Sequence, residues 1–144
     1  MANITSYPTA IPSSTDLILG TQLSATSVNK TRNFTAGTIT SAGLGYTSYT
    51  ALLTQAGTAA PVATVLSNNL TATLTWARAS ASVYTLTASA ATFTNNKTIV
   101  FFNNGNAGNG FVGKWTRTSD TVLTLNPTTD NALANGSFEV RIYA

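Results

Sequence analysis

Hydrophobic and polar residues alternate along most of the chain after Tyr46, as in strands that are half buried in a sheet. Turn-forming residues separate the alternating segments, which recur about every ten to thirteen residues, a spacing typical of a β-sandwich or barrel. The segments that we predict as strands are 46–54, 62–67, 71–78, 83–88, 97–103, 111–118, 121–126 and 137–143. The pattern therefore predicts an all-β fold, an antiparallel β-sandwich of jelly-roll-like or related topology.

Two of these segments also predict which side chains enter the core. In segment 71–78, Ala72, Leu74 and Trp76 share one face and threonines occupy the other. In the last segment, alternation predicts that Phe138, Val140 and Ile142 are buried, while Glu139 and Arg141 point outward. Each strand thus has one core face and one water face.

The first 45 residues have a different character, rich in Ser, Thr, Pro and Gly. Their one short apolar run is Leu17-Ile18-Leu19. We expect residues 1–45 to form an extended arm with one or two short strands or a turn of helix, which Asp16 could cap. The arm is too poor in apolar residues for a core of its own, so it needs a partner to pack against, whereas 46–144 form the sandwich domain.

Composition narrows the class of protein. Charged residues make up 8% of the 144 residues, against about 25% in an average soluble protein. Such a low charge gives little mutual repulsion and suits a protein held in an assembly. The net charge of +3 comes from scattered cations, so we expect no nucleic-acid binding. No run of about 18 apolar residues occurs, so we expect no membrane insertion.

The side chains that most enzymes use are missing. The chain has no histidine and no cysteine, which removes the usual general base, the best nucleophile and any thiolate metal site. The four carboxylates lie on separate predicted segments, and we expect them to be solvated: Asp16, Asp120, Asp130 and Glu139. We therefore predict no catalytic, cofactor-binding or metal-binding residues and no enzyme. A short hydrolase using two of these carboxylates is the enzymatic alternative.

One loop and one aromatic residue are candidates for ligand contact. The stretch 103–110 consists of Asn, Gly and Ala, but its glycine spacing is not that of a phosphate-binding loop. We predict that the flanking segments 99–102 and 111–112 pair as a hairpin with this stretch at its tip. Trp76 and the tyrosines 46, 49, 84 and 143 are expected mainly in the core, although they could also form a sugar-stacking platform. The candidate ligand contacts are Asn104, Asn106, Asn109 and a partly exposed Trp115.

The order of several motifs adds a family resemblance. The motifs of the sandwich are 46–66, Asn69-Leu70, Trp76-x-Arg78, Tyr84-Thr85-Leu86, 97–101 and 139–143, and those of the arm are 16–21 and 30–35. In this order they resemble structural proteins of tailed bacteriophages of Bacteroidetes, including crAss-like phages. The resemblance covers most of the chain and implies no catalytic residues and no cofactor.

The resemblance implies a structural protein at the virion surface, made in the cytoplasm of the host bacterium. Such proteins often continue into a shaft or receptor-binding tip, so we expect a domain that ends at 144 to be the displayed part itself, as a head fibre or capsid decoration protein. We expect a homotrimer bound to capsid, portal-vertex or tail components. The arm's clustered apolar residues are the candidate virion anchor: Leu17, Ile18, Leu19 and Phe34.

A second hypothesis uses the same fold for recognition. In it the protein is a tail-associated receptor-binding module that recognises a glycan on the host surface. Trp115 and the 103–110 loop would then lie near the contact.

Overall fold

The computed structural model describes residues 13–22, 30–105, 113–127 and 129–144. The chain divides into two compact units, Met1–Gly45 and Tyr46–Ala144. The second unit begins at the residue where the alternating pattern begins.

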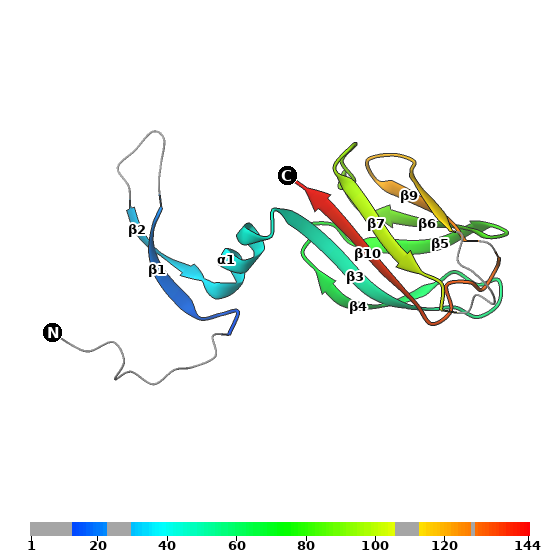
Figure 1. Ribbon diagram of the computed structural model, residues 1–144, viewed down its shortest axis with the longest axis horizontal. Coiled ribbons are helices and arrows are strands. Elements are labelled where there is room, and N and C mark those ends of the chain that lie inside the picture. The colour runs from blue at the N-terminus through cyan, green and yellow to red at the C-terminus, as the bar shows by residue number, and fades with distance from the viewer. Residues whose placement is uncertain (1–12, 23–29, 106–112, 128) are drawn as a thin grey trace. The chain divides into compact units, whose positions relative to one another are not determined.

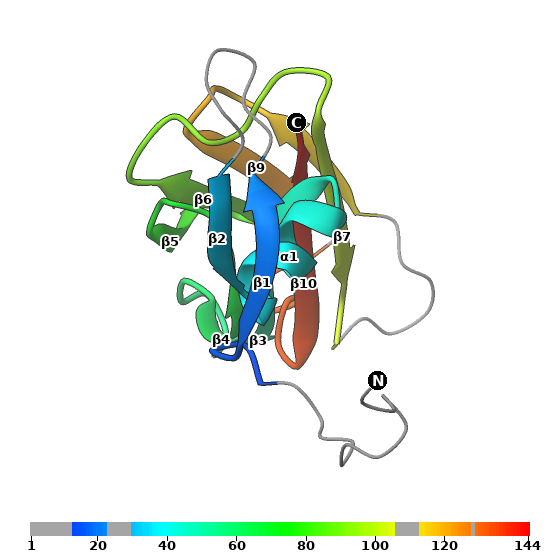
Figure 2. The same ribbon diagram turned by 90° about the vertical axis from the view of Figure 1, so that its left-hand side faces the viewer.

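The described part of the first unit is a β-hairpin followed by a short helix (Figure 2). Strand β1 (Leu17–Gln22) pairs antiparallel with β2 (Lys30–Thr35), and α1 (Ala36–Gly43) follows directly. Beyond the helix Gly45 has a φ of +67°, a conformation that glycine adopts readily at helix ends. An isolated two-stranded hairpin is marginally stable at best in water, so further contacts would stabilise this unit.

Asp16 supports the helix in a different way from the one expected. Its Oδ2 atom accepts a hydrogen bond from the Ser13 backbone N–H at 2.7 Å, which closes the turn before β1. The start of α1 is held instead by two carbonyl oxygens of that turn, because Ala36 N–H donates to Asp16 O at 2.8 Å and Gly37 N–H donates to Ser14 O at 3.0 Å. The expectation of a side-chain cap was wrong, since the carboxylate is already used within its own turn.

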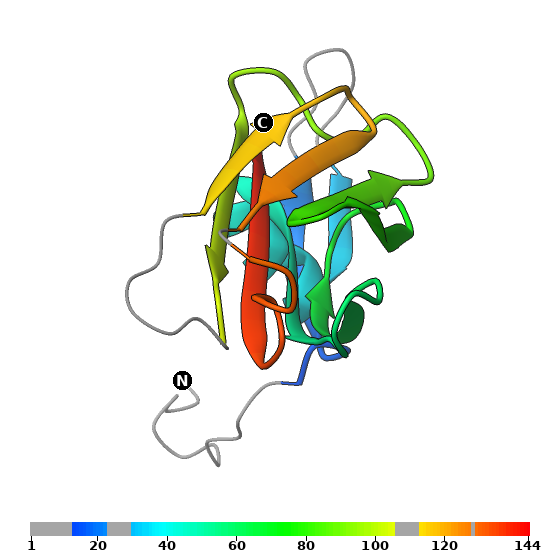
Figure 3. The ribbon, with the colours of Figure 1, turned by 90° about the vertical axis from the view of Figure 1, so that its right-hand side faces the viewer.

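The described part of the second unit contains eight strands in two sheets, which Figures 1 and 3 show as facing layers. The first sheet has the order β4-β3-β10-β7 and the second β5-β6-β9-β8, with every neighbouring pair antiparallel. The strands are β3 (Tyr46–Thr54), β4 (Val62–Asn68), β5 (Leu74–Ser80), β6 (Val83–Ala88), β7 (Thr98–Asn103), β8 (Lys114–Arg117), β9 (Val122–Asn126) and β10 (Gly136–Tyr143). The predicted all-β antiparallel sandwich is confirmed.

Strands β7 and β8, on either side of the stretch 103–110, do not pair with each other, and residues 111–112 of the predicted hairpin lie outside the described residues. Strand β7, which precedes the stretch, pairs with β10 in the first sheet, whereas β8, which follows it, pairs with β9 in the second. The chain therefore crosses from one sheet to the other between Asn103 and Lys114. Apolar segments on either side of a glycine-rich stretch resemble a hairpin in sequence, but each of these strands has its neighbour elsewhere.

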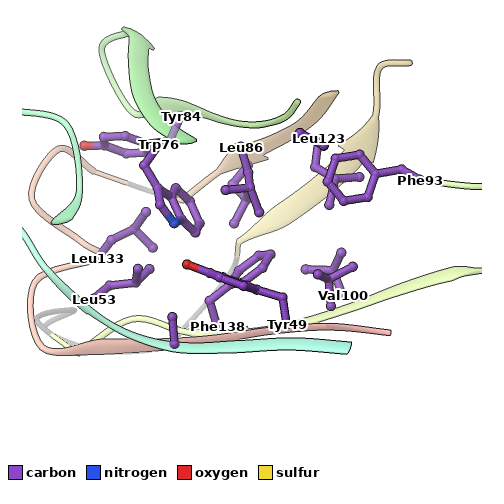
Figure 4. Close-up of a cluster of buried hydrophobic side chains, with 14 of the residues drawn as sticks. Tyr49, Leu53, Trp76, Tyr84, Leu86, Phe93, Val100, Leu123, Leu133 and Phe138 are labelled. Atoms are coloured by element: carbon purple, nitrogen blue, oxygen red, sulfur yellow. The ribbon is translucent and has the colours of Figure 1, made fainter. Parts of the chain in front are cut away.

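The core lies between the two sheets, as Figure 4 shows. The ring of Trp76 packs edge-on against Phe138, with ring centroids 5.0 Å apart, and Tyr49 also packs against Phe138 with centroids 6.2 Å apart. Phe138, Val140 and Ile142 are all buried, as their alternation predicts. The fully buried large side chains are Tyr84, Phe93, Phe138, Leu53, Leu86, Leu123, Leu125, Leu133 and Val140.

Candidate functional site

The predicted anchor residues lie on the hairpin of the first unit, on both of its faces. Leu17 and Leu19 share one face and are 64% and 72% exposed. Ile18 stands directly opposite Phe34 on the other face. The Phe34 ring covers Gly20, so that a Cβ added at Gly20 would lie only 3.2 Å from the ring. The hairpin thus presents two apolar side chains outward on the Leu17–Leu19 face.

No residue of the first unit belongs to the described hydrophobic core, which lies wholly within the sandwich. In the helix and just after it, Ile39 and Leu44 are 44% and 45% exposed. Leaving a large side chain in water forgoes about 1.5–3 kcal/mol relative to full burial. This concentration of exposed apolar groups on a small unit is what an attachment surface needs.

Of the four predicted ligand contacts, the structure describes Asn104 and Trp115. Trp115 is partly buried and packs against the core, and its partner across the strands is the fully buried Leu125. Asn104 was expected in an exposed loop, but it is buried, and neither polar atom of its side chain has a hydrogen-bond partner. Asn106 and Asn109 lie outside the described residues.

Each carboxylate has a partner of its own; Asp16 and Asp120 are exposed as expected, whereas Asp130 and Glu139 are partly buried. Asp120 is paired with Arg117, and Glu139 accepts a hydrogen bond from Arg141 Nε at 2.6 Å. Asp130 accepts two from Arg78, and Asp16 is bonded within its own turn. These pairs stiffen the fold locally, and they are not an arrangement of two carboxylates around a substrate.

Asp130 accepts more hydrogen bonds than the other three carboxylates. Besides Arg78, the backbone N–H of Ser82 donates to its Oδ1 at 2.9 Å and the Tyr84 hydroxyl donates at 3.1 Å. These hydrogen bonds, led by the one from Arg78, hold the pKa of Asp130 well below its usual range. The Tyr84 hydroxyl also accepts from Gln55 Nε2 at 2.7 Å, so the cluster ties β5 and β6 to the loop before β10.

The outer face of the first sheet carries a stack of planar groups. The Arg141 guanidinium carbon lies 4.9 Å from the centroid of the Tyr46 ring and 5.0 Å from that of Phe101. Tyr143 packs on Tyr46 with centroids 5.3 Å apart. The hydrogen bond to Glu139 raises the pKa of Arg141, so the guanidinium keeps its charge. Cation–π contacts and the ion pair hold this stack in one arrangement.

Beside this stack lies a shallow groove of about 280 Å³. It is lined by Thr50, Phe101, Phe102, Asn103, Ser137, Phe138 and Glu139. The strand register places Thr50, Glu139 and Phe101 in one row across β3, β10 and β7. Ser137 and Asn103 form the next row. A hydroxyl, an amide, a carboxylate and an exposed ring are therefore brought together from three strands.

Sequence reasoning did not find this groove. Its residues are far apart along the chain, and their meeting depends on β10 lying between β3 and β7. The one available signal was the clean alternation of the last strand, which predicted that Glu139 and Arg141 face outward.

Two further observations concern metals and membranes. Within the described ranges, no three side chains of His, Cys, Asp or Glu are grouped as a metal would require. Across those same ranges, no helix has both the length and the apolar character needed to span a bilayer.

No protein-family model matches the chain, and no match was found among curated proteins or solved structures. The resemblance to phage structural proteins therefore stays a prediction.

Proposed function

We propose that this protein is a non-enzymatic structural component of a bacteriophage virion, displayed on the particle surface as a head fibre or capsid decoration protein. Residues 1–45 attach it to a capsid, portal-vertex or tail component, and residues 46–144 are the displayed domain. The observation that carries the proposal is the contrast between the two units: the sandwich has its own core, whereas the hairpin leaves Leu17 and Leu19 exposed.

The exposed hairpin face fits attachment to a protein partner. A two-stranded hairpin gains stability when a third strand or an apolar surface covers it. Burying Leu17 and Leu19 against a partner would remove the two most exposed leucines of the described chain from water. A unit of this kind would be completed by the particle to which it binds.

The sandwich fits a displayed structural role. Its core is closed by large aromatic and aliphatic side chains, and its carboxylates are used in local ion pairs. The low charge content also suits an assembly in which many copies stand close together. The motif order and the absence of histidine and cysteine support the same role, and we propose a homotrimer as the displayed form.

The experiment compares incorporation of variants into particles of the phage that encodes the protein. Phage with a disrupted copy of the gene is grown in cells supplying either the double variant Leu17→Ser with Leu19→Ser or the control Leu52→Ser. Leu52 is also exposed, at 48%, but lies on the sandwich. Mass spectrometry of purified particles should find the control at wild-type level and the double variant strongly depleted.

Equal incorporation of the double variant and the wild-type chain would reject the proposed anchor. Circular dichroism of both variants checks that the sandwich remains folded, so that a loss of incorporation reports attachment and not unfolding.

A further inference from the structure

We infer that the groove on the outer face of the β4-β3-β10-β7 sheet binds a neutral sugar ring. This inference does not depend on the virion role, and it centres recognition on Phe101 and Glu139 instead of Trp115, with Asn103 as the residue it shares with the 103–110 loop suggested by the sequence.

The apolar wall of the groove suits the face of a pyranose. Phe101 points to the outer face of the sheet and is 50% exposed, whereas the preceding residue of β7, Val100, faces the core and is buried. The guanidinium of Arg141 packs over the Phe101 ring at 5.0 Å and fixes its orientation. A ring held in place before binding loses little conformational entropy when a ligand stacks on it. Aromatic rings pack well against the C–H faces of sugars because both surfaces are flat and apolar.

The polar groups of the groove suit sugar hydroxyls. Thr50 and Ser137 can each donate and accept a hydrogen bond, Asn103 can do both through its amide, and Glu139 accepts only. Arg141 occupies Oε1 of Glu139, and a carboxylate has further acceptor sites beyond one hydrogen bond. A few hydrogen-bond donors and acceptors beside an apolar wall are what a polyhydroxylated ligand requires.

Charge and size limit the ligand further. Glu139 and Arg141 neutralise each other, so the groove offers no net charge to an anion or a cation. Its volume of about 280 Å³ lies just below the range for small-molecule sites, about 300–1,000 Å³. A groove of this size limits the contact to about one sugar unit, with the rest of a glycan extending into solvent.

A second copy of the chain would fit this face less well. A subunit interface has an apolar centre with few charges, whereas the rows of this groove place Ser137, Glu139 and Thr50 between the apolar side chains. The polar floor therefore favours a hydroxyl-rich ligand.

The test is an NMR titration of the full-length, ¹⁵N-labelled protein with four methyl glycosides, those of glucose, galactose, mannose and N-acetylglucosamine, each added separately. At least one sugar should cause saturable amide shifts at Thr50, Phe101, Asn103, Ser137 and Glu139. Absence of saturable shifts with all four sugars, or shifts confined to other residues, would overturn the inference.

Variants sharpen the result. Phe101→Ala should weaken sugar binding about tenfold because it removes the stacking ring. Thr50→Val preserves the shape of the side chain and removes its hydroxyl, so it should weaken binding several-fold even if Phe101→Ala fails to fold. Ile99→Ala is the matched control, because Ile99 lies on the same strand and face, is 42% exposed and is outside the groove.

Sedimentation velocity distinguishes the remaining occupant. Three results together would show that the face is an interface between copies: the same amides shift with protein concentration, the variants change the mass of the sedimenting species, and sugars have no effect. The sugar site would then be rejected. If Ile99→Ala weakens sugar binding as much as Phe101→Ala, the effect is a general disturbance of β7, which also counts against the groove.

Discussion

Arg78 holds Asp130 through two parallel hydrogen bonds, from Nε at 3.1 Å and from Nη2 at 2.9 Å. The pair links β5 to the loop that precedes β10, across a long separation in sequence. Both side chains are about three-quarters buried, with 26% and 28% of their surfaces exposed. A paired geometry of this kind is more specific than a single surface ion pair.

Asp130→Asn should lower the midpoint of thermal unfolding at neutral pH. The substitution keeps the shape of the side chain but removes the charge that Arg78, Ser82 and Tyr84 all face. Asp120→Asn is the control, because Asp120 has the same charge and an arginine partner but is 69% exposed. Scanning calorimetry should show a clearly smaller decrease in the unfolding midpoint for the control. Equal decreases would mean that the Asp130 cluster stabilises the fold no more than the exposed Asp120 pair does.

The same cluster predicts how stability depends on pH. The pKa of Asp130 is lower in the folded protein than in the unfolded chain, chiefly because Arg78 donates to its carboxylate. Its contribution to stability is therefore complete above its ordinary pKa of about 4 and is lost progressively as the pH falls below that value. Urea unfolding at a series of pH values should show that the difference in free energy of unfolding between wild type and Asp130→Asn becomes smaller in acid. A difference in this free energy that does not change with pH would contradict the prediction.

Phe138→Ala should be one of the most damaging single changes in the core. Phe138 is 1% exposed and packs against Trp76 and Tyr49. We expect the free energy of unfolding to fall by about 3–5 kcal/mol, whereas Leu52→Ala on the exposed face should change it by about 0.5 kcal/mol or less. Chemical denaturation measures both, and similar losses would mean that the core is not centred on these rings.

Gly136 allows β10 to approach β7 closely. A Cβ at this position would lie 2.5 Å from the carbonyl oxygen of Asn103, far closer than two such atoms can approach. Gly136→Ala should therefore separate the two strands and destabilise the fold by about 1–3 kcal/mol. Gly43→Ala is the control, because a Cβ there meets no atom within 4 Å. Equal free energies of unfolding for the two variants would contradict the close approach of Gly136 to Asn103.

The oligomeric state is a further prediction. Light scattering on a sizing column should give the full-length protein three times the chain mass of 14.9 kDa. A chain starting at Tyr46 should give a trimer as well if the sandwich itself makes the interface. A monomeric full-length protein would contradict the proposed homotrimer.

Local sequence patterns predicted much of the sandwich. The bounds of β3 and β6 agree with the predicted segments, and the faces of Trp76 and Phe138 follow from alternation. Strand β5 begins at Leu74 and not at residue 71, since the residues before it form a bend. The alternating pattern reports burial, and Ala72 is buried although it lies before the first residue of the strand.

Pairing between distant strands could not be predicted in the same way. Nothing near β10 in the sequence specifies that it lies between β3 and β7, or that β6 pairs with β9. The groove at Thr50, Phe101 and Glu139 depends on that order, so it was missed. The position of the helix after β2 was not predicted either, because its start is held by backbone carbonyls that carry no side-chain signal.

The most direct measurement of the central claim is immunogold electron microscopy of intact, purified phage particles, using antibodies raised against the folded protein. Gold label is expected on the outer surface of wild-type particles and none on particles lacking the gene. Label that appears only after the particles are disrupted, or protein absent from the particles altogether, would contradict a displayed virion component.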